Sequence, residues 1–94
     1  MITLENWSVI TDHLYAAPEL GLLLLNGQCY NHDDLRHYDG KWISTSYIRE
    51  VNGNAITTSN GTVYHLGKPA DEYVAWCKKT GAHVPTEEVP IKIT

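Results

Sequence analysis

The stretch "VNGNAITTSNGTVYHLG", residues 51–67, carries two Asn-Gly pairs between short runs of strand-forming residues. Asn and Gly tolerate the positive φ angles that tight hairpin turns require. The preceding run "WISTSYIREV", residues 42–51, is rich in β-branched and aromatic residues, and burial on both faces or a bulge near Ser46 would explain its imperfect alternation. These segments predict an antiparallel meander of strands at 42–51, 55–59 and 62–66.

A helical pattern lies on either side of this meander. In "TLENWSVITDHLY", residues 3–15, apolar side chains recur at helical spacing and predict a short helix over about residues 4–15. In "KPADEYVAWCKKTG", residues 68–81, a proline and two acidic residues begin the segment, while two lysines and Gly81 end it. This order of charges and caps predicts a second helix.

Between the first helix and the meander, "LLLLNGQCYN", residues 22–31, predicts a buried strand in which Asn26-Gly27 is either a hairpin turn or a bulge. The expected architecture is a single α+β domain spanning 1–94, with a small antiparallel sheet of three to four strands and an N-terminal and a C-terminal helix packed on it. Residues 82–94 are expected to form either a flexible tail or an edge strand.

Composition narrows the class of protein. The formal charge of −4 opposes the neutralisation of many phosphates, so nucleic-acid binding is not expected. No signal peptide or membrane span is apparent, and Cys29 and Cys77 form no CxxC motif. The expectation is a cytoplasmic protein with free thiols and no membrane contact.

The segment "CYNHDDLRHYDGKWISTS", residues 29–46, concentrates reactive side chains. Cys29, His32 and His37 are candidate zinc ligands, but a structural zinc site normally brings a second pair of ligands from elsewhere in the chain. A histidine base with a hydroxyl nucleophile from residues 44–46 would need a convergence that chain proximity does not provide. We therefore expect no enzyme activity and no cofactor, with a zinc-binding domain as a lesser alternative.

Aromatic residues favour a binding role. The chain has six Tyr, three Trp and no Phe, and Tyr and Trp are the residues most enriched at binding hot spots. The expected binding surface lies around the 29–46 segment, where aromatic and acidic side chains alternate. Its predicted members are Tyr30, Asp33, Asp34, Tyr38, Asp39, Trp42 and Tyr47.

Two binding functions are compatible with this pattern. The first is recognition of a host protein by an acidic, aromatic surface, with a homodimer as one arrangement of the chain. The second uses the hydroxyl-rich runs "ISTS" and "ITTS", residues 43–46 and 56–59, to hold a nucleotide-like small molecule against Trp42, Tyr47 or Tyr64 at a dimer interface. Thr is also simply a good strand former, so cross-strand pairing of these hydroxyls is the plainer interpretation.

Residues 39–67 also resemble small uncharacterised proteins encoded by phages and prophages of enteric bacteria. The shared order is Asp-Gly, Ile-x-Thr-Ser-x-Ile, a turn, Thr-Thr-x-x-Gly-x-x-Tyr and Leu-Gly, and it covers about a third of the chain. The resemblance implies an accessory protein that binds and modulates or inhibits a host protein, including an anti-defence role. No site residues carry over with it.

Overall fold

The computed structural model describes residues 1–11, 14–15 and 23–92. Within them the chain forms seven strands and one helix, in which strands account for most of the regular structure. In chain order the elements are β1 (Ile2–Thr11), β2 (Leu14–Tyr15), β3 (Leu24–Tyr30), β4 (Lys41–Ser44), β5 (Ile48–Asn52), β6 (Ala55–Thr58), β7 (Val63–Leu66) and α1 (Asp71–Thr80).

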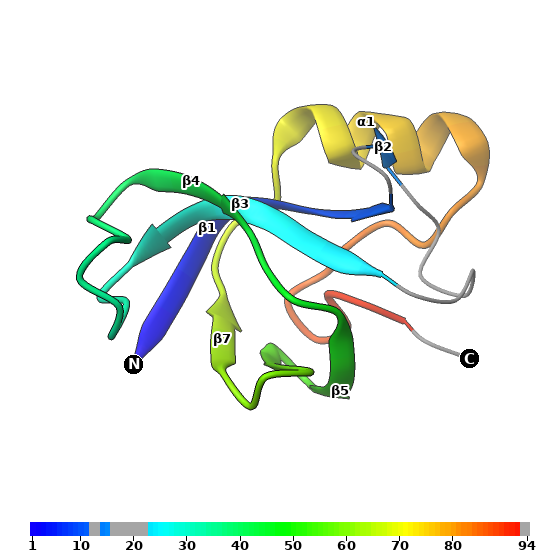
Figure 1. Cartoon of the computed structure of the whole chain (residues 1–94). Coiled ribbons are helices and arrows are strands. Elements are labelled where there is room, and N and C mark those ends of the chain that lie inside the picture. Colours follow the sequence, from blue (N-terminus) through cyan, green and yellow to red (C-terminus); the bar gives the residue numbers. More distant parts are fainter. Residues whose placement is uncertain (12–13, 16–22, 93–94) are drawn as a thin grey trace.

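Six of the described strands lie side by side in the order β4-β3-β1-β7-β6-β5, and β2 pairs with the end of β1. The sheet is mixed, because β1 and β7 are parallel while the other pairs are antiparallel. The two outermost strands, β4 and β5, are consecutive in the chain, and the Ile48 N–H donates to the Leu23 carbonyl at 2.8 Å. The sheet therefore curls back on itself, as the path from β4 into β5 shows in Figure 1.

A β-bulge divides β1 into two halves. The register of β1 against β3 shifts between Glu5 and Ser8, and Asn6 has a φ of 51°. Gly27 lies opposite this point, where a Cβ would be 2.9 Å from the Glu5 carbonyl oxygen and 3.1 Å from the Trp7 Cα. A glycine is required there because the bulge brings two backbones together.

The bulge places Trp7 in the core and ties β1 to the chain that follows β7. The Trp7 indole N–H donates to the Gly67 carbonyl at 3.0 Å, and the Gly67 N–H donates to the Leu4 carbonyl at 2.9 Å. One residue further, the Lys68 N–H donates to the Glu5 carboxylate at 2.8 Å, which lies over the Gly67 Cα. Both halves of β1 are thus held to residues 60 or more positions later in the chain.

The helix α1 lies across the sheet near the C-terminal half of β1 (Figure 1). Acidic residues occupy its first turn, lysines its last, and Gly81 ends it with a φ of 80°. Tyr73 and Cys77 are its buried residues, and the Tyr73 ring lies 5.9 Å from the Trp7 ring between centroids. The helix is therefore docked on the same tryptophan that the bulge turns inward.

The predicted architecture was wrong in two respects. Residues 4–15 do not form a helix: residues 4–11 belong to β1 and 14–15 to β2, while residues 12–13 lie outside the described part. The i, i+3 spacing of Leu4 and Trp7 comes from the bulge, which shifts the phase of a strand by one residue. The sheet has six strands in mixed order instead of three to four antiparallel ones, and the helix at Asp71–Thr80 is the single helix of the described chain.

Local predictions within the meander were closer to the structure. Strands β5, β6 and β7 pair antiparallel in sequence, and the interruption near Ser46 separates β4 from β5. Asn26-Gly27 is not a turn, because β3 runs through it and the bulge lies in the opposite strand. In the tail, no strand occurs among the described residues after α1, and Ile91 is buried in the core.

Because the Glu5 carboxylate lies against Gly67, we expect a methyl group at residue 67 to lower the free energy of unfolding only while Glu5 is present. Gly67→Ala would overlap the Glu5 carboxylate and displace it from the Lys68 N–H, so we expect a loss of about 1–3 kcal/mol in the free energy of unfolding. In a Glu5→Ala background the same substitution should cost less than about 0.5 kcal/mol. Urea unfolding of the four proteins measures this coupling, and additive effects would contradict it.

Candidate functional site

The loop between β3 and β4, residues 31–40, is held by its own polar side chains. Asp34 Oδ1 accepts hydrogen bonds from the Arg36 backbone N–H at 2.9 Å and from Arg36 Nε at 3.1 Å, while Asp34 Oδ2 accepts from Arg36 Nη2 at 2.7 Å. The Arg36 hydrogen bonds hold the pKa of the Asp34 carboxyl well below its usual value. The first half of the loop is therefore a closed turn around one ion pair.

The second half of the loop is tied to the neighbouring strands. Asp39 Oδ1 accepts from the Asn31 N–H at 2.8 Å, and the Gly40 N–H donates to the Cys29 carbonyl at 2.8 Å. Lys41 Nζ reaches back to the Arg36 carbonyl at 3.0 Å. These bonds fix the shape of the loop without using a buried apolar side chain from it.

The same loop displays large apolar side chains to solvent. Leu35 is 97% exposed and Tyr38 is 68% exposed, and Trp42, two residues beyond the loop on β4, is 55% exposed. Leu35, Tyr38 and Trp42 are called the loop surface below. An ordered loop that presents apolar groups outward is unusual, because such groups normally provide the burial that holds a loop in place.

The other predicted binding residues differ in exposure and in whether they already have a partner within the loop. Asp33 and Asp39 are exposed, whereas Asp34 is occupied by Arg36 and stabilises the loop. Tyr30 is half-buried beneath the loop, and Tyr47 is 47% exposed in the segment between β4 and β5. Sequence reasoning did not select Leu35, although a single leucine among polar loop residues fits neither a helical nor a strand pattern and could have been recognised as exposed.

The two histidines of the loop lie close together, in a polar depression of the curled sheet that is called the mouth below. This mouth has a volume of about 470 Å³ and lies between the loop, the segment after β4 and the turn before β7. The rings of His32 and His37 are 4.6 Å apart between centroids, and His32 Nε2 is 3.0 Å from the Tyr64 hydroxyl. Because His32 Nδ1 accepts the Asp34 N–H at 3.0 Å, the neutral ring carries its proton on Nε2 and donates to Tyr64.

A zinc site is not assembled from the predicted ligands. Cys29 is fully buried, and its Sγ faces the His37 and Tyr38 carbonyls at 3.8 and 3.6 Å. No group of three or more His, Cys, Asp or Glu among the described residues could hold a metal ion. Both cysteines are buried free thiols, and burial raises the pKa of each.

The buried hydroxyls of the two hydroxyl-rich runs, residues 43–46 and 56–59, form hydrogen bonds within the protein. The Thr45 hydroxyl accepts from the Leu25 N–H at 3.1 Å and donates to the Ser46 carbonyl at 2.8 Å. The Thr58 hydroxyl is 2.6 Å from Asn60 Oδ1 and fully buried. Among the described residues, no hydrogen bond joins His32 or His37 to the hydroxyls of residues 44–46. The hydrogen bonds of Thr45 and Thr58 stabilise the sheet.

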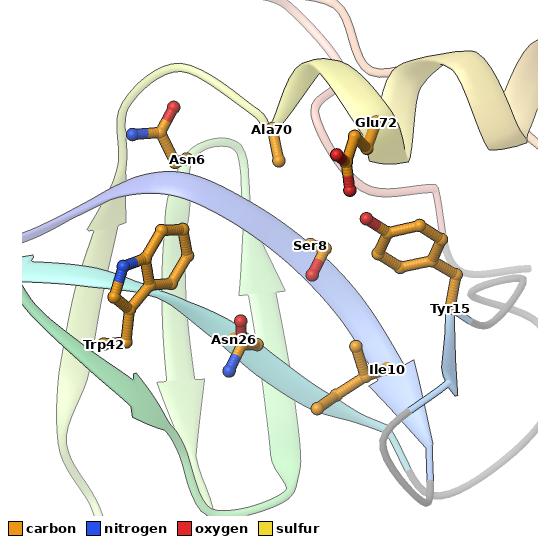
Figure 2. Close-up of a pocket in the computed structure, with 8 residues that line it drawn as sticks. All are labelled: Asn6, Ser8, Ile10, Tyr15, Asn26, Trp42, Ala70 and Glu72. Carbon is orange, nitrogen blue, oxygen red and sulfur yellow. The ribbon is translucent and has the colours of Figure 1, made fainter.

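A second depression, a groove of about 480 Å³, begins at Trp42 and runs toward the start of α1. Figure 2 shows the Trp42 indole on one side, Asn26 and Ser8 along the floor, and the Glu72 carboxylate above the Tyr15 hydroxyl at the other end. Burial raises the pKa of Tyr15, and the charge and hydrogen bond of Glu72 raise it further. The groove therefore adjoins the loop surface through Trp42.

Comparison of the chain with protein-family models, curated proteins and solved structures gave no match. The resemblance of residues 39–67 to phage and prophage proteins stays a prediction. No helix of the described residues is long and apolar enough to cross a membrane.

The environment of His32 predicts a loss of stability in mild acid. Burial lowers the His32 pKa below its ordinary value of 6.5, and the neighbouring His37 lowers it further. The charges of Asp34 and Asp33 act in the opposite direction but are smaller effects. As pH falls below about 6.5, the unfolded chain therefore takes up this proton before the folded protein does. The free energy of unfolding should be retained above that pH and decrease as pH falls through the folded-state pKa.

His32→Asn tests this prediction, because Asn keeps an acceptor for the Asp34 N–H and cannot be protonated. Urea unfolding between pH 7.5 and 5 should show a smaller decrease for the variant than for the wild type. Parallel stability curves for the two proteins would rule out His32 as the source.

Proposed function

We propose that this protein is a non-catalytic binding protein that recognises another protein through the loop surface and thereby modulates or inhibits it. The observation that carries the proposal is the ordered loop that exposes Leu35 and Tyr38, followed on β4 by the exposed Trp42. A surface that is already in its bound shape loses little conformational entropy on association. The contacts of Asp34 with Arg36 and of Asp39 with Asn31 provide that order.

Charge favours a partner with a basic surface. Residues 31–41 contain three Asp against Arg36 and Lys41, which leaves a formal charge of −1 there, and the whole chain has a charge of −4. Asp33 and Asp39 form no ion pair with the described residues. Carboxylates around an apolar centre steer association with a complementary basic surface.

The same charges argue against a second copy of this chain as the occupant of the loop surface. A two-fold interface would bring each loop against its own equivalent. It would then place Asp33 and Asp39 near the same residues of the other copy, and like charges of this kind oppose pairing. The partner is therefore a different protein, which agrees with the host-protein partner that the phage resemblance implies.

The nucleotide-like ligand has less support. Thr45 and Thr58, the buried hydroxyls of the two candidate runs, are satisfied within the sheet. The Ser44 hydroxyl accepts from Asn26 Nδ2 at 3.2 Å. In the mouth, the Arg36 guanidinium that could meet a phosphate is already hydrogen-bonded to Asp34.

Loss of the loop side chains should remove binding without affecting the fold. Leu35→Ala/Tyr38→Ala should raise the dissociation constant of the main partner by about 30-fold or more. Truncation of a hot-spot residue typically costs about 2 kcal/mol or more of binding free energy. The unfolding free energy of the double variant should stay within about 0.5 kcal/mol of the wild type, because both side chains are exposed. Capture from a bacterial lysate, followed by titration with the purified partner, provides the measurement.

Val63→Ala is the matched control, since Val63 is an apolar residue of β7 that is 40% exposed and outside the loop surface. It should bind as the wild type does. Equal partner sets for the wild type and the double variant, or the absence of any specific partner, would defeat the proposal.

The order of the loop is testable separately. Asp34→Ala removes the acceptor of the Arg36 hydrogen bonds while leaving Leu35 and Tyr38 in place. We expect faster amide hydrogen exchange for residues 35–38 and roughly five- to tenfold weaker partner binding, because the loop must then be ordered on association. Unchanged affinity together with faster exchange would show that preorganisation does not contribute.

A further inference from the structure

The groove beside Trp42 has polar groups whose orientation is set by the backbone around them. Asn26 Nδ2 donates to the Ile43 carbonyl at 3.2 Å and to the Ser44 hydroxyl at 3.2 Å. A carbonyl only accepts, so the Asn26 amide nitrogen must face β4 and its oxygen must face away. Figure 2 shows this oxygen directed toward the groove.

Ser8 adds a second polar atom to the floor of the groove. The residue is 4% exposed and lines the groove. A serine hydroxyl can donate and accept, so Ser8 offers a ligand in the groove a further acceptor.

The far end of the groove carries a negative charge. Tyr15 donates its hydroxyl proton to the Glu72 carboxylate, which leaves the remaining lone pairs of Glu72 and of Tyr15 as acceptors. The neighbouring Asp71 lies 3.8 Å from Lys68, whereas Glu72 forms no ion pair with the described residues. None of the described residues that line the groove is basic.

These features select a class of ligand. The carbonyl oxygen of Asn26 and the carboxylate of Glu72 only accept hydrogen bonds, and the half-exposed indole of Trp42 offers a face that attracts cations. A phosphate or carboxylate would find no positive charge among these groups. A guanidinium is planar, positively charged and carries five N–H donors, so it can lie against an indole and still donate to acceptors at its edge.

We propose that this groove binds an arginine side chain of the partner protein, with the guanidinium on the Trp42 indole, its N–H groups directed to Asn26 and Ser8, and the Glu72 carboxylate providing negative charge at the far end. The inference rests on the proposed protein-binding function, because Trp42 belongs to both the loop surface and the groove. It adds the chemistry of the partner. The partner would present an apolar patch to Leu35 and Tyr38 and an arginine side chain that enters the groove.

The probe for a test is N-acetyl-arginine amide, titrated into the full chain and followed by NMR at the Trp42 indole N–H. We expect saturable shifts with a dissociation constant of about 1–10 mM, as suits a single small side chain. N-acetyl-citrulline amide has nearly the same shape without the charge and should bind at least about tenfold more weakly. Trp42→Ala should abolish saturable binding of the arginine probe.

Substitution of two different glutamates tests whether Glu72 provides the negative charge that attracts the arginine. Glu72→Gln keeps a hydrogen-bonding group of the same size beside Tyr15 and should weaken arginine binding about three- to tenfold. Glu88→Gln removes an exposed carboxylate that does not line the groove and should have no effect. Equal binding of the arginine and citrulline probes, shifts that do not saturate, or equal effects of the two variants would overturn the inference.

This outcome can be separated from that of the proposed function. Leu35→Ala/Tyr38→Ala should keep the arginine affinity of the wild type while losing the partner, because neither residue lines the groove. Failure of the arginine titration with the loop effect intact would reject the groove inference alone. Saturable arginine binding that the loop variant also loses would show that the groove is not an independent site, and would overturn the inference in this form.

Discussion

The bulge at Asn6 and Trp7 is the constraint on which the rest of this structure depends. It lets Leu4 and Trp7, three residues apart, both face the core, and it is accommodated by the bare backbone of Gly27 in the neighbouring strand. The Trp7 side chain then serves two purposes, since its ring packs against Tyr73 of the helix while its N–H anchors Gly67. The helix, the central strand and the exit from β7 are therefore positioned by one irregularity in one strand.

Sequence patterns predicted those elements whose signals are local. The hairpins of the meander and the capped helix at Asp71–Thr80 follow from turn residues and charges close together in the chain. The bulge could not be inferred in this way, because its spacing imitates a helix and the residue that accommodates it, Gly27, lies in a strand 20 residues later. The parallel pairing of β1 with β7 is likewise a contact between distant segments that no periodicity reports.

For the proposed binding surface, the sequence predicted the exposure of Tyr38 and Trp42 but not the contacts of its acidic residues. Tyr38 and Trp42 were selected as aromatic residues flanking a polar loop, and both are more than half exposed. Asp34 was selected for the same surface but is committed to Arg36, an ion pair that depends on the turn of the loop. Ser8 and Glu72 could not be associated with Trp42 from sequence, because the curl of the sheet and the docking of α1 bring together groups from three separate elements.

The position of β1 in the sheet has a consequence for how the chain reaches its fold. This strand lies centrally between β3 and β7, and its parallel partner begins about 60 residues later. The hairpins β5–β6 and β6–β7 can form as soon as their own residues are available, but one side of the central strand can pair only after Tyr64 to Lys68 have been synthesised. Contacts of such sequence separation are slow to form, so pairing of β1 with β7 is expected to be a late step in folding. During synthesis β1 can pair with β3 early, but its β7 side remains unpaired until most of the chain has left the ribosome.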